Sequence, residues 1–243
     1  MKTKVWAHRG ASAYAPENTL EAFELAVKMH AEGVELDVHL SRDGELMVGH
    51  DETVNRCSNG TGKINEMTCA QLKELDFGVH FPEYRGAKMP TLEEVYKLLK
   101  PTGLFINIEI KSLPNIYEGI EQKLDDLATA MGMQDHIIYS SFDHYTLVNM
   151  RAIIPKVPLG ILYSHGEYEP WKYAASIGVN ALHPHYASLK RPVVPGSQAA
   201  GIAVHPWTVD DEGVLELMYR MGVEAVISNK PDVALAVRAK VQG

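Results

Sequence analysis

Hydrophobic and polar residues alternate strictly in two short runs of the chain. In GVELDVHL, the polar residues Glu35, Asp37 and His39 alternate with aliphatic ones. The later run FINIEIK repeats the arrangement with Glu109 and Lys111. Alternate residues of a strand share one face, and strands that alternate with helices usually have both faces covered. Because a covered carboxylate is costly without a positive partner, these two runs indicate a site.

Strand-like runs recur along the whole chain, and helical patterns separate most of them. The strand candidates are KVWAHRG, GVELDVHLS, ELMVGHD, LFINIEIK, HIIYSSF, PLGILYS, NALHPHY, IAVHPWTV and EAVISN. Helices are expected over 18–29, 69–75, 90–99, 117–131, 145–153, 168–176, 195–200, 212–221 and 231–241. Such alternation in about 250 residues predicts an α/β fold, a closed (β/α)8 TIM barrel.

Nine strand candidates are one more than this barrel needs. GVELDVHLS and ELMVGHD are joined only by Arg42, Asp43 and Gly44, a hairpin turn signal. Since parallel neighbours need a longer crossover, one of these two runs is expected above the barrel rim. The turn-rich stretch of about 52–89 reads as an insertion over the barrel mouth. The whole chain, 1–243, is expected to form a single domain.

Composition excludes several classes of protein. The chain has 243 residues, 46% of them hydrophobic, and a formal charge of −8, which argues against a general nucleic-acid binder. No apolar run is long enough to span a bilayer, and the N-terminus has no signal-peptide pattern, so a cytoplasmic location is expected.

Cys57 and Cys69 are expected as free thiols in such a location, although a disulfide between them stays open. The oligomeric state also stays open, and a homo-oligomer is compatible with the sequence.

Three carboxylates form the candidate metal site. Glu35, Asp37 and Glu109 offer hard oxygen ligands without a cysteine, a set that suits Mg²⁺ or Ca²⁺. The alternative is that the first two lie on an exposed strand edge and pair with surface lysines.

Two histidines end strand-like runs, where side chains of a barrel face the site. A histidine titrates near neutral pH, so one of His8 and His50 can donate a proton while the other accepts one. Arg9 and Lys111 stand beside the candidate residues and suit phosphate binding. The alternatives are a histidine bonded to a backbone carbonyl and cations that only balance charge.

Several further residues are weaker candidates. The run NTLE predicts a capping box with Asn18 as N-cap and Glu21 at N3, and Glu17 is expected to orient Arg9 or a histidine. Trp207 is either a wall of the substrate pocket or a core residue. Four histidines lie on or beside strands and are expected to line the pocket without catalysing: His39, His183, His185 and His205.

Taken together and in order, the motifs resemble those of the glycerophosphodiester phosphodiesterase family. They are HRG (8–10), PENT (16–19), ELD (35–37), SRDG (41–44), GHD (49–51), NGTG (59–62), PTLEEV (90–95), EIK (109–111), SSF (140–142), WTV (207–209) and ISNKPD (227–232). The resemblance covers nearly the whole chain. It implies a TIM barrel that uses a divalent metal to hydrolyse glycerophosphodiesters to sn-glycerol 3-phosphate and an alcohol.

The resemblance also assigns roles to residues. His8 and His50 match the acid/base pair, Glu35, Asp37 and Glu109 the metal ligands, and Arg9 and Lys111 the phosphate-binding cations. Our expectation is that His50 is the acid and His8 the base. The nucleophile is either water or the glycerol 2-hydroxyl, and the resemblance favours the second. Ser228 and Asn229 depart from the usual motif, which leaves the role of their loop open.

Two other functions are compatible with parts of this pattern. A lysophospholipase D-like or phosphoinositide phospholipase C-like enzyme would need an apolar or membrane-facing surface. A phosphate-binding barrel without activity would be expected to have lost one of the matched residues. We therefore expect a small water-soluble substrate and a segment 52–89 that helps to select the alcohol.

Overall fold

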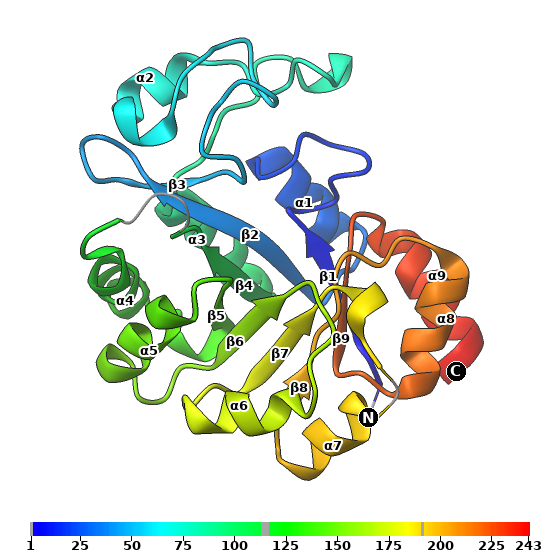
Figure 1. Cartoon of the computed structure of the whole chain (residues 1–243). Helices are drawn as coiled ribbons and strands as arrows, with labels where there is room; N and C mark the ends of the chain where they lie inside the picture. Colours follow the sequence, from blue (N-terminus) through cyan, green and yellow to red (C-terminus); the bar gives the residue numbers. More distant parts are fainter. Residues whose placement is uncertain (1, 113–116, 191) are drawn as a thin grey trace.

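Eight parallel strands form a ring in the computed structural model, which describes residues 2–112, 117–190 and 192–243 (Figure 1). The strands are β1 (Lys4–His8), β2 (Gly33–Leu40), β4 (Phe105–Ile110), β5 (Ile137–Ser141), β6 (Leu159–Tyr163), β7 (Ala181–Pro184), β8 (Ala203–Val204) and β9 (Ala225–Ser228), hydrogen-bonded in the order β8-β7-β6-β5-β4-β2-β1-β9. The backbone N–H of Ile227 donates to the carbonyl of Pro206, and the N–H of Val209 donates to the carbonyl of Ile227. These two hydrogen bonds join β9 to the segment after β8. The predicted TIM barrel is confirmed.

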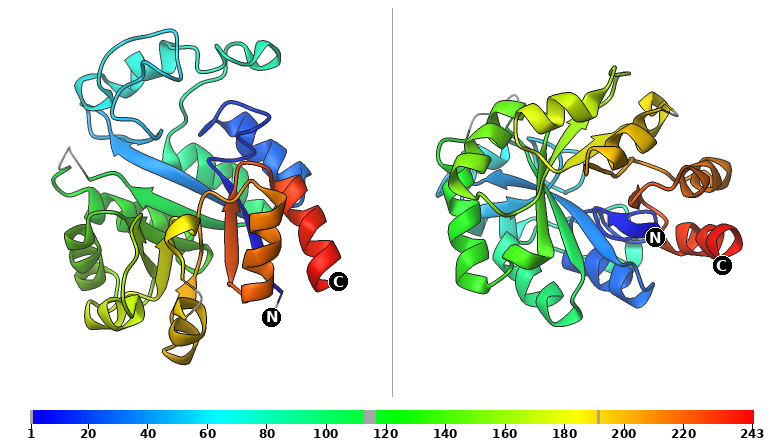
Figure 2. Two further views of the ribbon diagram at one scale, coloured as in Figure 1. Left: turned by 45° about the vertical axis from the view of Figure 1, so that its right-hand side comes forward. Right: turned by 90° about the horizontal axis from the view of Figure 1, so that it is seen from below.

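Helices surround the ring, as the view from below shows (Figure 2). They are α1 (Leu20–Lys28), α2 (Cys69–Glu74), α3 (Leu92–Leu99), α4 (Ile120–Met131), α5 (His144–Ile153), α6 (Pro170–Ser176), α7 (Val193–Ala199), α8 (Glu212–Met221) and α9 (Pro231–Gln242). Their ends lie within three residues of the predicted ones. Among the described residues, no helix is both long and apolar enough to cross a membrane.

The extra strand candidate is β3 (Leu46–Val48), which pairs antiparallel with the end of β2 and lies outside the ring. Val38 pairs with Val48, so the hairpin extends β2 past the barrel rim. The predicted excursion above the rim is therefore confirmed. Its consequence is that His50, two residues after β3, lies at the same end as the carboxyl ends of the strands.

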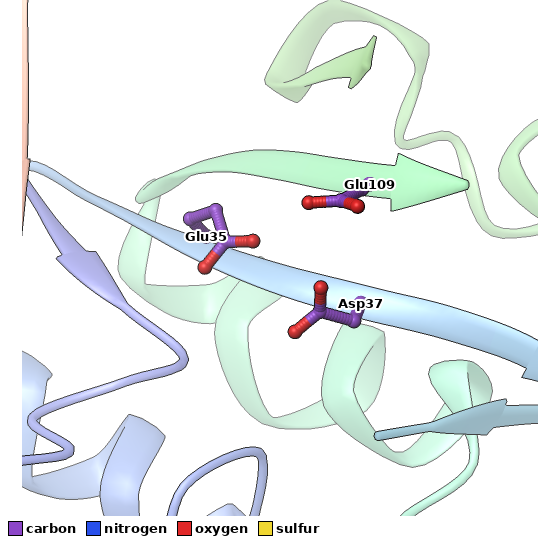
Figure 3. Close-up of side chains that lie close together, drawn as sticks. All are labelled: Glu35, Asp37 and Glu109. Carbon is purple, nitrogen blue, oxygen red and sulfur yellow. The ribbon is translucent and has the colours of Figure 1, made fainter. Parts of the chain in front are cut away.

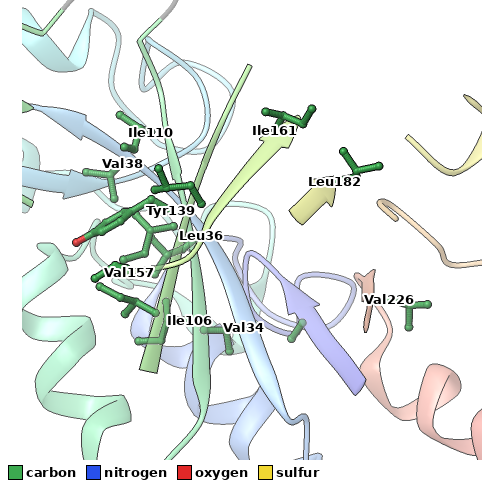
Figure 4. Close-up of a cluster of buried hydrophobic side chains, with 14 of the residues drawn as sticks. Val34, Leu36, Val38, Ile106, Ile110, Tyr139, Val157, Ile161, Leu182 and Val226 are labelled. Atoms are coloured by element: carbon green, nitrogen blue, oxygen red, sulfur yellow. The ribbon is translucent and has the colours of Figure 1, made fainter. Parts of the chain in front are cut away.

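The two faces of β2 have different surroundings. Val34, Leu36 and Val38 are fully buried in the hydrophobic core between the ring and its helices (Figure 4). The alternating residues Glu35 and Asp37 face the barrel interior, where they are buried too. Aliphatic residues thus anchor the strand on one side and hold carboxylates in the interior on the other.

The amino-terminal half of the barrel interior is filled by a second cluster, which contains Trp6, Ile138 and Ile227. His183 and His205 are buried above it and hydrogen-bonded to each other, with 3.0 Å between Nε2 and Nδ1. Because this half is packed, space for a ligand is left at the carboxyl ends of the strands.

Segment 52–89 lies beyond the carboxyl end of β2 and carries α2 (Figure 1). Together with Met47 of β3 it forms a small separate hydrophobic cluster, made of Met47, Val54, Ile64, Leu72, Phe77 and Met89. Short 3-10 helices cover Ile64–Glu66 and Pro82–Tyr84. Selection of the alcohol by this segment stays a prediction.

Candidate active site

Three carboxylates converge inside the barrel (Figure 3). Asp37 on β2 is the register partner of Glu109 on β4, and Glu35 lies one inward position earlier. One carboxylate oxygen from each residue lies within 4.8 Å of the others, and all three side chains are buried. Burial raises the pKa of Glu35 well above its ordinary value, and the charge of Asp37 adds to this. This cluster needs positive charge to stay ionised.

Two cations supply part of that charge. Lys111 Nζ lies 2.7 Å from Glu109 Oε1 and 3.3 Å from Asp37 Oδ1. Arg9 Nε lies 3.5 Å from Asp37 Oδ2, and its backbone N–H donates to Glu35 Oε2 over 2.9 Å. Burial raises the pKa of Asp37, but Lys111 and Arg9 outweigh it, so the net shift is downward. When all three carboxylates are ionised, the two cations leave one net negative charge.

The carboxylate oxygens of the cluster have lone pairs left for a divalent cation. Asp37 Oδ1 is buried and has no hydrogen-bond partner among the described residues, and Glu35 has only Oε2 engaged by a backbone N–H. Buried carboxylate oxygens with spare lone pairs are the ligands that Mg²⁺ and Ca²⁺ prefer. The residues present therefore fit the predicted hard cation.

His8 at the end of β1 is held in one tautomer. Its Nδ1 lies 2.7 Å from Asn229 Oδ1, and Asn229 Nδ2 donates to Asp210 Oδ2 over 2.6 Å. The Asp210 carboxylate only accepts, so the amide oxygen of Asn229 must face the ring and His8 Nδ1 must donate. Nε2 is then the unprotonated nitrogen, 3.8 Å from Glu35 Oε2. Burial, helped by the charge of Arg9, lowers the pKa of His8 to about 4.

His50 is held differently, by an ionised carboxylate. Its Nδ1–H donates to Asp51 Oδ1 over 2.7 Å, and its side chain is one-third exposed. Hydrogen bonds from Arg56 keep the pKa of Asp51 well below its usual range. His39 Nε2 also donates to the backbone carbonyl of His50 over 3.1 Å. The two histidines therefore face one site with different partners, a neutral amide for His8 and a carboxylate for His50.

The structure corrects one prediction about the loop before α1. Asn18 is not the N-cap, because its φ of 58° is left-handed and turns its side chain into the barrel, where Nδ2 donates to Asp37 Oδ2 over 2.9 Å. Thr19, in an extended conformation, caps α1 by accepting the N–H of Ala22. Glu17 accepts a hydrogen bond from Arg9 Nη1 over 2.8 Å.

Trp207 lies at the rim, where its ring meets Phe142 and His185 edge to face. Its Nε1–H donates to the carbonyl of His183 over 2.7 Å. The predicted strand around it is shorter than expected, since β8 ends at Val204 and Trp207 forms only an isolated bridge with His185. A role as pocket wall stays a prediction.

Sequence reasoning missed four residues of this site. Asp51 and Asn229 belong to the motifs GHD and ISNKPD, which could have drawn attention to them. Arg56 and Asp210 stand in turn-like runs and carried no signal of their own. Asn229 contacts His8 across 221 residues of sequence, and spacing along the chain cannot reveal such a pair.

Known proteins resemble this chain over nearly its whole length. A model of the Glycerophosphoryl diester phosphodiesterase family matches residues 8–233. The glycerophosphodiester phosphodiesterase of Caldanaerobacter subterraneus subsp. tengcongensis is 41% identical over 97% of both chains. That of Bacillus altitudinis is 35% identical over 99% of this chain and 100% of the relative.

Solved structures agree with the fold. A phosphodiesterase from Oleispira antarctica in complex with the product sn-glycerol-3-phosphate is 30% identical, with a TM-score of 0.87 over 97% of this chain and 96% of that chain. A structure from Silicibacter pomeroyi reaches a TM-score of 0.91 over 99% of this chain and 94% of that chain. At 22% identity, this second likeness bears on the fold alone.

Proposed function

The chain belongs to the glycerophosphoryl diester phosphodiesterase family, and we propose that it hydrolyses glycerophosphodiesters to sn-glycerol 3-phosphate and an alcohol with the help of a divalent cation. The convergence of three buried carboxylates between two cations and two histidines carries this proposal. The product named for the Oleispira antarctica relative supports the identity of the phosphate product.

Charge balance supports the cation and the substrate together. With all three carboxylates ionised, as metal ligands would be, the cluster of Glu35, Asp37, Glu109, Arg9 and Lys111 has one net negative charge. A divalent cation would make it positive by one, and a singly charged phosphodiester would then neutralise it. Mg²⁺ or Ca²⁺ held by the three carboxylates would act as a Lewis acid on the phosphoryl oxygens.

His8 is the proposed base. Its tautomer leaves the Nε2 lone pair directed into the site, and its low pKa keeps the ring neutral at physiological pH. A neutral Nε2 can accept the proton of the nucleophile, either water or the 2-hydroxyl of the substrate glycerol. Attack by the 2-hydroxyl would release a cyclic glycerophosphate before the final product, which ³¹P NMR would detect.

His50 is the proposed acid. The Asp51 carboxylate accepts its Nδ1–H over 2.7 Å, which orients the ring and compensates its positive charge when it is protonated. Nε2–H of that form can then protonate the leaving alkoxide. Arg9 and Lys111 both lie beside the Asp37 carboxylate, where they can bind the phosphoryl oxygens.

Leaving-group chemistry tests the two roles. Alanine at His8 or His50 should lower turnover of glycerophosphocholine by about 10²–10⁴-fold. A nitrophenyl ester hardly needs an acid, so it should rescue His50→Ala and not His8→Ala. Circular dichroism and thermal unfolding would establish that both variants fold. Equal rescue of both variants, or full activity of either, would contradict the proposal.

A further inference from the structure

Arg56, in the insertion, holds two carboxylates at once. Its Nε and Nη2 donate to Asp51 over 2.8 and 3.0 Å. Its Nη1 and Nη2 donate to Glu17 over 2.7 and 2.8 Å. This paired, planar geometry is specific to a guanidinium, because the single ammonium of a lysine cannot form two such forks.

Each of these carboxylates also holds one residue of the proposed site. Asp51 accepts the Nδ1–H of His50, and Glu17 accepts a hydrogen bond from Nη1 of Arg9. Arg56 is therefore the link between the support of the proposed acid and the support of a phosphate-binding cation. Without it, two neighbouring carboxylates would lose their shared counter-charge and could turn away from His50 and Arg9.

The number of N–H groups left free distinguishes Arg56 from a substrate-binding residue. A guanidinium has five N–H groups, and four of those of Arg56 are engaged by Asp51 and Glu17. One N–H is left for any other ligand. Arg9 differs, because its buried Nε–H has no hydrogen-bond partner among the described residues and stays available for an anion.

We propose that Arg56 is a positioning residue, through which segment 52–89 fixes Asp51 against His50 and Glu17 against Arg9. The inference rests on the proposed function and deepens it, since it makes the insertion part of the catalytic apparatus. The burial of Glu17 raises its pKa, but the hydrogen bonds of Arg56 and the charge of Arg9 produce a net downward shift, in agreement with an ionised bridge.

The first test compares substrates that differ in their leaving group. Loss of a partner that orients a metal ligand typically costs about 10–100-fold in activity, and we expect a loss of the same order for a residue that orients the proposed acid. Arg56→Ala should therefore lower kcat for glycerophosphocholine by about 10–100-fold and kcat for a nitrophenyl ester of glycerophosphate by no more than about 3-fold, since the second substrate hardly needs the acid. Arg56→Lys should lie between Arg56→Ala and the wild type. Arg85→Ala, an exposed arginine of the same segment, is the matched control and should leave both rates unchanged.

The second test is a double-mutant cycle. If Arg56 acts on kcat through Asp51, then Arg56→Ala should add no more than about 2-fold to the loss already caused by Asp51→Asn. Arg56→Ala should also raise KM, because Glu17 would no longer be fixed against the phosphate-binding Arg9, and this rise should disappear in the Glu17→Gln background. Independent, multiplicative effects in both backgrounds would overturn the inference, because they would place Arg56 on the substrate.

The outcomes separate this inference from the proposed function. An inactive wild-type protein would overturn the proposed function itself. An active wild type with an equally active Arg56→Ala variant, or with equal losses for both leaving groups, would overturn only the positioning role. Thermal unfolding would establish that each variant folds. Arg56→Lys, which keeps the charge, takes the place of Arg56→Ala if the alanine variant does not fold.

Discussion

Glu109→Gln should remove metal binding without weakening the metal-free fold. Its carboxylate lies within 4.8 Å of those of Glu35 and Asp37, and two unit charges at that separation repel by about 3.5 kcal/mol at an effective dielectric constant near 20. The substitution relieves two such repulsions and loses one attraction to Lys111, at 2.7 Å worth about 6 kcal/mol on the same scale. These contributions nearly cancel, so the metal-free variant should unfold within a few degrees of the wild type.

Added cation should then raise the Tm of the wild type and leave that of Glu109→Gln unchanged. A ligand at 100 times its Kd stabilises the folded state by about 2.7 kcal/mol, which raises Tm of a chain of this size by roughly 5–11 °C. Differential scanning fluorimetry of chelator-treated protein, with and without Mg²⁺ or Ca²⁺, would measure this rise in the wild type and its loss in Glu109→Gln. Glu83→Gln, an exposed carboxylate, is the control. An unchanged rise in Glu109→Gln, or no rise in the wild type with either ion, would rule out a cation held by Glu109.

Three further outcomes are expected. Asn229→Leu removes the acceptor that fixes the tautomer of the proposed base, so kcat should fall about 10–100-fold at nearly unchanged Tm, and wild-type kinetics would contradict this. Replacement of 57–89 by a short linker, which keeps Arg56, should change the ranking of choline and ethanolamine esters more than the sensitivity to chelator; an unchanged ranking would count against alcohol selection by the segment. Because the pKa values of Glu17 and Asp51 are lowered in the folded state, their bridge to Arg56 stabilises the fold above about pH 5 and loses this effect as the pH falls. The stability difference between wild type and Arg56→Ala in urea unfolding should therefore shrink from pH 7 to pH 3.5, and a constant difference would exclude the linkage.

The alternation of residues allowed much of the fold to be predicted. Strands with aliphatic residues on one face and Glu35, Asp37 and Glu109 on the other can be buried only where positive charge meets the carboxylates, and Arg9 and Lys111 supply that charge in the barrel interior. The Asp-Gly turn likewise identified the hairpin that carries the chain to His50. Both features depend on local periodicity and turn chemistry, which a single sequence contains.

The supports of the site could not be predicted in the same way. Asn229 reaches His8 only because β9 and β1 are neighbours in the closed barrel. Arg56 contacts Glu17 across 39 residues, through a segment with no periodic pattern. Asn18 followed the rule for helix caps, but the bond to buried Asp37 outweighs that local preference. Contacts set by tertiary packing leave no regular spacing in the sequence.

The most direct test of the account is a ³¹P NMR time course of glycerophosphocholine hydrolysis by the wild-type protein, with chelator and after Mg²⁺ or Ca²⁺ is restored. We expect the resonance of sn-glycerol 3-phosphate to grow only when the cation is present, and we expect His50→Ala, with the cation restored, to slow its growth by about 10²–10⁴-fold. Phosphocholine as the product would mean that the other phosphoester bond is cleaved. Undiminished release in the presence of chelator would contradict the role of the three carboxylates.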